Sequence, residues 1–116
     1  MFAIVIRHSP YSSQLAREGL EAALACAAFG QDVRLYFLDE GVWAALAQQQ
    51  GQLNNRKDLG KMLGALSLYD IEHAYVDLDS LQRRGLSLSD IHTELQVVES
   101  SHWQQQLRQA THVLSF

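Results

Sequence analysis

The chain alternates between short apolar runs and longer amphipathic segments. The apolar runs are rich in β-branched residues, as in strands that are buried on both faces of a sheet. They predict five strands, at residues 2–6, 32–38, 71–78, 94–100 and 111–116. The intervening segments predict helices at residues 15–30, 39–49, 59–70, 79–85 and 102–110. Polar, turn-rich residues predict an exposed loop at 48–58 and a connector at 86–93.

The alternation of strands and helices predicts an α/β fold of flavodoxin-like or Rossmann-like type. Its central five-stranded sheet should be mainly parallel, with right-handed crossovers and helices on both faces. The chain of 116 residues suffices for one compact domain, so we expect a single domain over residues 1–116.

Composition and charge limit the kinds of function that this chain could have. The net charge is −4, and no cluster of Lys and Arg suggests direct nucleic-acid binding. The single cysteine, Cys26, excludes a disulfide within the chain and a thiolate-rich metal site. The first residues lack the basic region of a secretory signal, and no apolar run is long enough for a membrane span. We therefore expect a cytoplasmic protein without membrane contact.

The segment after the third predicted strand carries a possible active site. Asp77 and Asp79 could supply an aspartyl nucleophile or bind a divalent metal for phosphoryl transfer. Such enzymes also need a lysine and further carboxylates, and no lysine follows Arg84. The structural alternative, which we favour, is that Asp79 caps the next helix and Asp77 is a solvated loop residue.

Other candidates also have structural alternatives. Cys26 lies near the carboxyl end of its helix, where the helix dipole disfavours a thiolate, so we expect buried packing. A persulfide carrier that uses Cys26 is the alternative. His8 could reach the crevice at the end of the first strand, but no histidine pairs with another at zinc-ligand spacing. Residues 7–13 contain no glycine, which argues against a dinucleotide site or a P-loop. FMN binding through this serine-rich loop is the weaker alternative to an ordinary β–α turn.

Large aromatic residues suggest a protein partner. Trp43, Trp103, Tyr69 and Phe29 are many for so small a core, and aromatic side chains are enriched at interfaces. The alternative is partial burial within the monomer.

Several segments together resemble one family. They are REGLEAALACAA in the first helix, FLDEGVWAAL after the second strand, ALSLYDIEHAYV into the third strand, SLQRRGL after it and the final HVLSF. These segments, in this order, resemble the DsrF-like subunit of the DsrE/DsrF/DsrH sulfur-relay family. The resemblance implies a small α/β domain in a heterohexamer with TusB-like and TusD-like subunits. It further implies that the complex passes persulfide sulfur to a TusE-like acceptor, toward 2-thiouridine at tRNA wobble positions.

The resemblance also bears on Asp77. In the D-like subunit an active cysteine follows the third strand, and here the matching neighbourhood reads YVDLDSLQRRG. Asp77 stands near that position, and a carboxylate cannot carry a persulfide. We therefore assign no catalytic, cofactor or metal residue and predict a non-catalytic structural subunit. Two alternatives remain, namely a metal-dependent phosphoryl-transfer enzyme and a DsrF-type role in dissimilatory sulfur oxidation.

Overall fold

The computed structural model describes residues 1–47 and 58–116. Its strands are β1 (Phe2–Ile6), β2 (Val33–Phe37), β3 (His73–Asp77), β4 (Gln96–Val98) and β5 (His112–Ser115). Its α-helices are α1 (Leu15–Ala28), α2 (Asp58–Gly64), α3 (Leu78–Arg83) and α4 (Ser100–Leu107). Short 3-10 helices are η1 (Asp39–Ala45), η3 (Leu66–Tyr69) and η4 (Leu88–Asp90).

The five strands form one sheet in the order β4-β3-β2-β1-β5, and every neighbouring pair is parallel. The predicted α/β fold is therefore confirmed, and the sheet is parallel throughout. Because all the strands run in the same direction, their carboxyl ends meet at one edge of the sheet, where α/β proteins place their sites.

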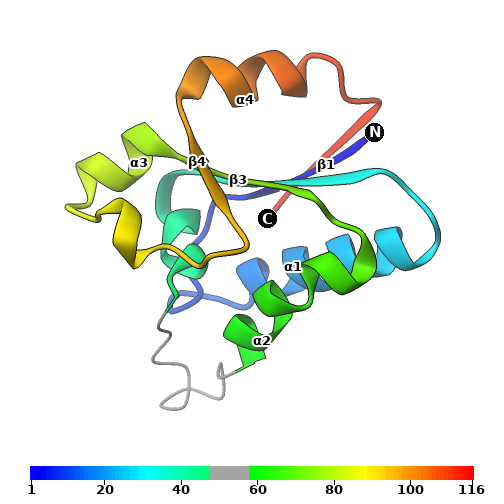
Figure 1. The fold of residues 1–116 in the computed structure, drawn as a ribbon, viewed down its shortest axis with the longest axis horizontal. Helices are drawn as coiled ribbons and strands as arrows, with labels where there is room; N and C mark the ends of the chain where they lie inside the picture. The colour runs from blue at the N-terminus through cyan, green and yellow to red at the C-terminus, as the bar shows by residue number, and fades with distance from the viewer. Residues whose placement is uncertain (48–57) are drawn as a thin grey trace.

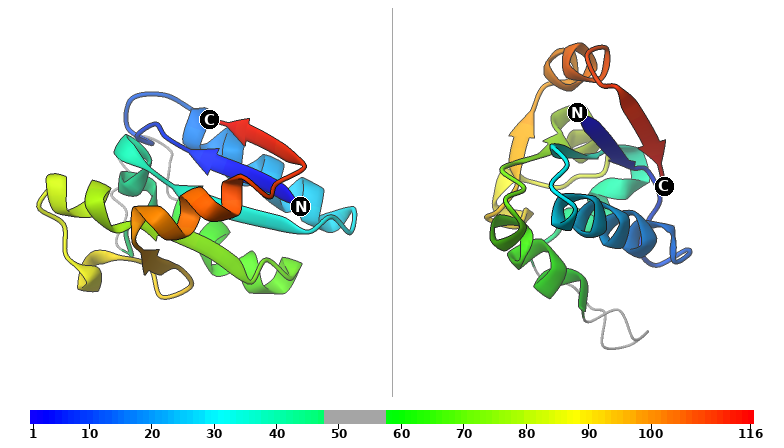
Figure 2. Two further views of the ribbon diagram at one scale, coloured as in Figure 1. Left: turned by 90° about the horizontal axis from the view of Figure 1, so that it is seen from above. Right: turned by 90° about the vertical axis from the view of Figure 1, so that its right-hand side faces the viewer.

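The two faces of the sheet are covered unequally (Figures 1 and 2). Helices α1 and α2 lie on one face and α4 lies on the other. Strand residues that alternate along the chain point to opposite faces. Ile4, Phe37 and Val76 accordingly join the larger core with Leu20 of α1. The smaller core against α4 contains Ala3, Val5, Tyr36, Leu38, Tyr75 and Val98, with Trp103 and Leu107 packed against it.

Several predicted elements differ in type or length from the observed ones. The segment after β2 forms a 3-10 helix, η1, rather than an α-helix, and Asp39 begins it with a positive φ of 53°. The predicted helix at 59–70 is divided into α2 and η3, and Asp70 ends η3 in the left-handed conformation. The strand predicted at 94–100 is shorter because α4 begins at Ser100. Residues 48–57 of the predicted loop lie outside the described residues.

The large aromatic residues fall into two groups. Trp43 and Trp103 are half-buried, whereas Phe29 is 86% exposed and Tyr69 is 42% exposed. Partial burial within the monomer therefore accounts for the two tryptophans, and the expected partner contact at the other two stays a prediction. The described part of the chain contains no helix with the length and apolar character that a membrane crossing requires.

Candidate functional site

Asp77 lies at the sheet's carboxyl edge, at the end of β3, between the ends of β4 and β2. It is the last residue of β3 and also the N-cap of α3, because its carboxylate accepts a hydrogen bond from the Ser80 backbone N–H. Asp77 is only 4% exposed. Our expectation that Asp79 would cap this helix and that Asp77 would be solvated was therefore wrong. The helix begins one residue earlier than predicted, and the buried carboxylate rather than the exposed one provides the cap.

Four donors saturate the Asp77 carboxylate. Oδ2 accepts from the Ser80 N–H at 3.1 Å and from the Ser80 hydroxyl at 2.7 Å. Oδ1 accepts from the Ser100 hydroxyl and from the Trp103 indole N–H, both at 2.8 Å. An ionised carboxylate offers about four lone-pair sites, so none is left for another ligand. The carboxylate therefore joins the end of β3 to the first turns of α3 and α4.

Ser80 extends this network to the neighbouring strand. Its hydroxyl accepts a hydrogen bond from the Asp39 backbone N–H at 2.9 Å while it donates to Asp77. Its carbonyl accepts from Arg84, which also reaches Glu40 at 3.2 Å. The loops that follow β2 and β3 are thus fixed relative to each other through one serine side chain.

The network sets the charge state of Asp77. Burial alone would raise the pKa of this carboxyl group, because the charged form loses water. Hydrogen bonds from Ser80, Trp103 and Ser100 oppose that effect and leave the pKa of Asp77 below its ordinary value of 3.8. The amino ends of α3 and α4 also favour a negative charge there. Asp77 is consequently an anion at neutral pH, although no cation pairs with it in the described residues.

Asp79 lies apart from Asp77 in its interactions. Its side chain is 54% exposed and pairs with Arg83 at 2.8 Å across one turn of α3. The two carboxylates therefore do not share a site, as a divalent metal would require. No group of three or more His, Cys, Asp or Glu residues in the described part of the chain is placed to hold a metal ion.

A cavity of about 380 Å³ adjoins Asp77 on the α4 side of the sheet. Its walls are mainly apolar, and the charged lining residues besides Asp77 are Arg7 and Asp39, which pair at 3.2 Å. The full lining consists of Val5, Arg7, Leu38, Asp39, Asp77, Trp103, Leu107, Val113 and Ser115. Because the Asp77 oxygens are already bonded, this cavity offers apolar contact rather than a free nucleophile.

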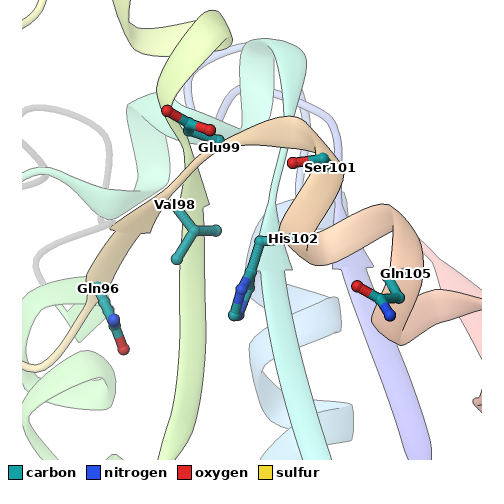
Figure 3. A pocket seen from close by; sticks show the side chains of 6 residues that line it. All are labelled: Gln96, Val98, Glu99, Ser101, His102 and Gln105. Atoms are coloured by element: carbon teal, nitrogen blue, oxygen red, sulfur yellow. The ribbon is translucent and has the colours of Figure 1, made fainter.

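A second cavity, of about 400 Å³, lies between β4 and α4 (Figure 3). His102 extends from α4 into this space, and Gln96 and Val98 approach it from β4. The amide nitrogen of Gln106 lies 3.0 Å from His102 Nε2, and Tyr36 donates to the amide oxygen of Gln106 at 2.7 Å. Burial raises the pKa of Tyr36 to about 12, which keeps its phenol a donor. This arrangement holds α4 on the sheet.

The remaining sequence candidates lie away from Asp77. Cys26 is half-buried in α1 and packs against the larger core on the other face of the sheet, so the predicted burial is partial. His8 is exposed after β1 and lines a neighbouring cavity with Arg7 and Asp39. The structure therefore brings neither residue into contact with the Asp77 network.

Sequence reasoning missed three partners of Asp77. Ser80 is near Asp77 in the chain, but Asp79 and Gln82 have the same N-cap spacing, so spacing alone does not identify the cap. Ser100 and Trp103 lie 23 and 26 residues away from Asp77 along the chain. No local pattern pairs residues so far apart, and Trp103 was noticed only as an aromatic residue.

The fold and this network define an α/β protein that carries a structural carboxylate, rather than a free reactive group, at the end of its third strand. Residues 1–116 match the model of the DsrE/DsrF-like family. The chain belongs to that family, and the resemblance found in its sequence segments is confirmed.

Individual relatives agree with this assignment. The chain is 38% identical over 112 residues to a protein TusC homolog from Vibrio vulnificus strain CMCP6, a match that covers 97% of this chain and 95% of the relative. It is 41% identical over 90 residues to a protein TusC homolog from Pasteurella multocida, with 76% of each chain covered. The crystal structure of the Escherichia coli YchN protein has a TM-score of 0.83 at 24% identity and covers 99% of this chain and 97% of its own. That likeness shows the fold alone.

Proposed function

We propose that this chain is a non-catalytic structural subunit of a TusC type in a cytoplasmic sulfur-relay complex. In that complex it would sit with TusB-like and TusD-like subunits in a heterohexamer, while the thiol of a partner subunit carries the persulfide. The complex would deliver sulfur to a TusE-like acceptor, toward 2-thiouridine at tRNA wobble positions. This proposal rests on the similarity to TusC homologs over nearly the whole chain.

The state of Asp77 is the observation that carries the non-catalytic part of the proposal. Sulfur transfer proceeds by thiolate attack through S–S intermediates, which an aspartate cannot form. Moreover, four hydrogen bonds already use the lone pairs of this carboxylate. A residue so fully bonded supports the shape of the carboxyl edge, which suits a subunit that builds the docking surface for a reactive partner.

Native mass spectrometry of the tagged chain, isolated gently from its own host, tests the assembly. We expect a complex that contains two other subunits of similar size, one of them with a cysteine after its third strand. That cysteine should carry the persulfide. Isolation of the chain alone, or only with copies of itself, would refute the proposed assembly.

A substitution of the single cysteine tests the non-catalytic role. In the reconstituted complex, Cys26→Ser should leave the rate of sulfur transfer to the acceptor within about twofold of the wild-type rate, because Cys26 packs in α1 away from the carboxyl edge. The measurement is transfer of radiolabelled sulfur, with the D-like subunit's cysteine replaced as the inactive control. Loss of transfer in a fully assembled Cys26→Ser complex would show that this chain takes part in the chemistry.

A further inference from the structure

We propose that β5 is a docking edge, on which an extended segment of another subunit of the complex adds a sixth strand and places an apolar side chain in the cavity beside Asp77. This inference rests on the proposed function for the existence of the partner. The position of the docking edge follows from the features of β5 itself.

The outer side of β5 is open. The strand lies at the end of the sheet, and in the described residues only β1 pairs with it (Figure 2). Each of its residues is exposed, and the apolar Val113 and Leu114 are 50% and 43% exposed. Natural sheets usually protect an edge with lysine, proline, a bulge or a covering element. β5 has neither lysine nor proline, so its sequence lacks these protective residues.

The backbone of β5 presents free hydrogen-bonding groups outward. Phe116, directly after the strand, donates its N–H to Val5 at 2.8 Å and accepts from Arg7 at 2.7 Å, so both of its backbone groups face β1. Bonding direction alternates along an edge strand of a parallel sheet. The N–H and C=O groups of Val113 and Ser115 therefore point away from β1, where an added strand would bond them. Only an extended segment matches such a row.

The side chains of Val113 and Ser115 line a cavity that could receive a side chain of the docked segment. Val113 and Ser115 line the cavity of about 380 Å³ next to Asp77, together with Leu38 and Leu107. Alternate residues of a strand point to one face, so a segment paired with β5 would direct its own alternate side chains to this same face. The cavity has room for an apolar side chain, and its apolar walls favour one.

Charge indicates a further property of the segment. Arg108 is exposed at the end of α4, four residues before β5, and has no ion-pair partner in the described part of the chain. Neither β5 nor the residues on either side of it, Thr111 and Phe116, have a charged side chain of opposite sign. A carboxylate on the docked segment, in addition to its apolar anchor, would complement the charge of Arg108.

Hydrogen exchange on the wild-type protein tests the docking edge without any substitution. The amides of Val113 and Ser115 should exchange at least tenfold more slowly in the complex isolated from the host than in the free chain. The amide of Phe116 faces β1 and serves as the internal reference, because it should be protected in both states. Equal exchange of Val113 and Ser115 in the two states would overturn the proposal.

Two substitutions test the same edge by blocking it. Ser115→Pro removes an outward N–H, and Val113→Lys places a charge at the cavity, so each should lower the amount of co-isolated subunits at least tenfold. Gln104→Lys, an exposed position on α4, is the charge-matched control and should change nothing. Thermal unfolding of each free variant establishes that it is folded, and Val113→Lys suffices if Ser115→Pro does not fold.

The outcomes separate this inference from the proposed function. If both folded edge variants assemble like the wild type, the docking edge is wrong, whereas the sulfur-relay assembly stands. If the wild-type chain brings no other subunit, the proposed function fails and the partner assigned to β5 fails with it. If the wild type instead forms a dimer that Val113→Lys dissociates, the occupant is a second copy and the assignment to another subunit is overturned.

Discussion

Replacement of Gly41 with alanine is expected to lower the free energy of unfolding by about 3 kcal/mol or more, at the upper end of the cost of overpacking a core. Gly41 is buried in η1, directly against the end of β1. A Cβ atom at this position would overlap the carbonyl oxygen of Ile6 and lie 2.5 Å from its carbonyl carbon and 3.0 Å from the Arg7 nitrogen. All three neighbours are backbone atoms, so no side chain can rotate away.

The surrounding hydrogen bonds prevent an easy adjustment. The Ile6 carbonyl accepts from the Leu38 N–H at 2.9 Å, and the Gly41 N–H donates to the Leu38 carbonyl at 2.8 Å. A shift that relieves the overlap must therefore break a bond at the carboxyl end of β1 or β2. Urea unfolding followed by circular dichroism measures the loss.

Gly60→Ala is the matched control for Gly41→Ala. Gly60 lies inside α2, and a Cβ there would meet no atom within 4 Å. Alanine should stabilise that helix by about 0.5–1 kcal/mol, because glycine loses more backbone entropy on folding. If Gly41→Ala unfolded at the same urea concentration as the wild type, the close packing of η1 on β1 would be contradicted.

The sequence predicted the positions of the strands and helices better than the contacts at the carboxyl edge of the sheet. The run FAIVI and the helix at 15–30 are local patterns, because burial of a strand or a helix face repeats with a short period along the chain. The structure places both where these patterns predict them, with α1 ending at Ala28. By contrast, η1 depends on the contact between Gly41 and Ile6, which no local period encodes.

At the Asp77 site, too, contacts between near neighbours in the sequence differ from contacts between residues far apart in the chain. The cap on Ser80 is local, but Asp79 has the same spacing to Gln82, so the local sequence offers two possible caps and does not choose between them. The environment of Asp77 depends on Ser100 and Trp103, which come from another helix. The expectation of a solvated Asp77 was wrong because α4 covers a residue that looks like a loop residue in isolation. Its correspondence to the cysteine of the D-like subunit stays a prediction.

Asp77→Asn should destabilise the protein by about 3 kcal/mol, because either orientation of the amide places its NH2 group against a donor that cannot accept. Ser80 presents a backbone N–H to one oxygen of Asp77, and Trp103 presents an indole N–H to the other. Neither group can accept a hydrogen bond, and each buried unsatisfied donor costs roughly 1–3 kcal/mol. Asp79→Asn, which removes only an exposed pair with Arg83, should cost about 0.5 kcal/mol or less.

The pH dependence of stability shows how much of the contribution of Asp77 to the free energy of unfolding comes from its negative charge rather than from its packing. The folded state lowers the pKa of Asp77 below its ordinary value of 3.8. The stability that the carboxylate contributes is therefore fully present above that ordinary value and is lost as the pH falls through the lower pKa of the folded state. The difference in free energy of unfolding between the wild type and Asp77→Asn should be largest near neutral pH and should shrink in acid.

The two aspartate variants together decide whether Asp77 is a structural anion. A large loss in Asp77→Asn that shrinks in acid, beside a small loss in Asp79→Asn, is the pattern that four hydrogen bonds to one buried carboxylate require. If Asp77→Asn were as stable as Asp79→Asn at neutral pH, the carboxylate would not be held by obligate donors. A free carboxylate at the end of β3 would then be available for metal binding, and calorimetric titration of the wild type with Mg²⁺ would be the direct measurement of it.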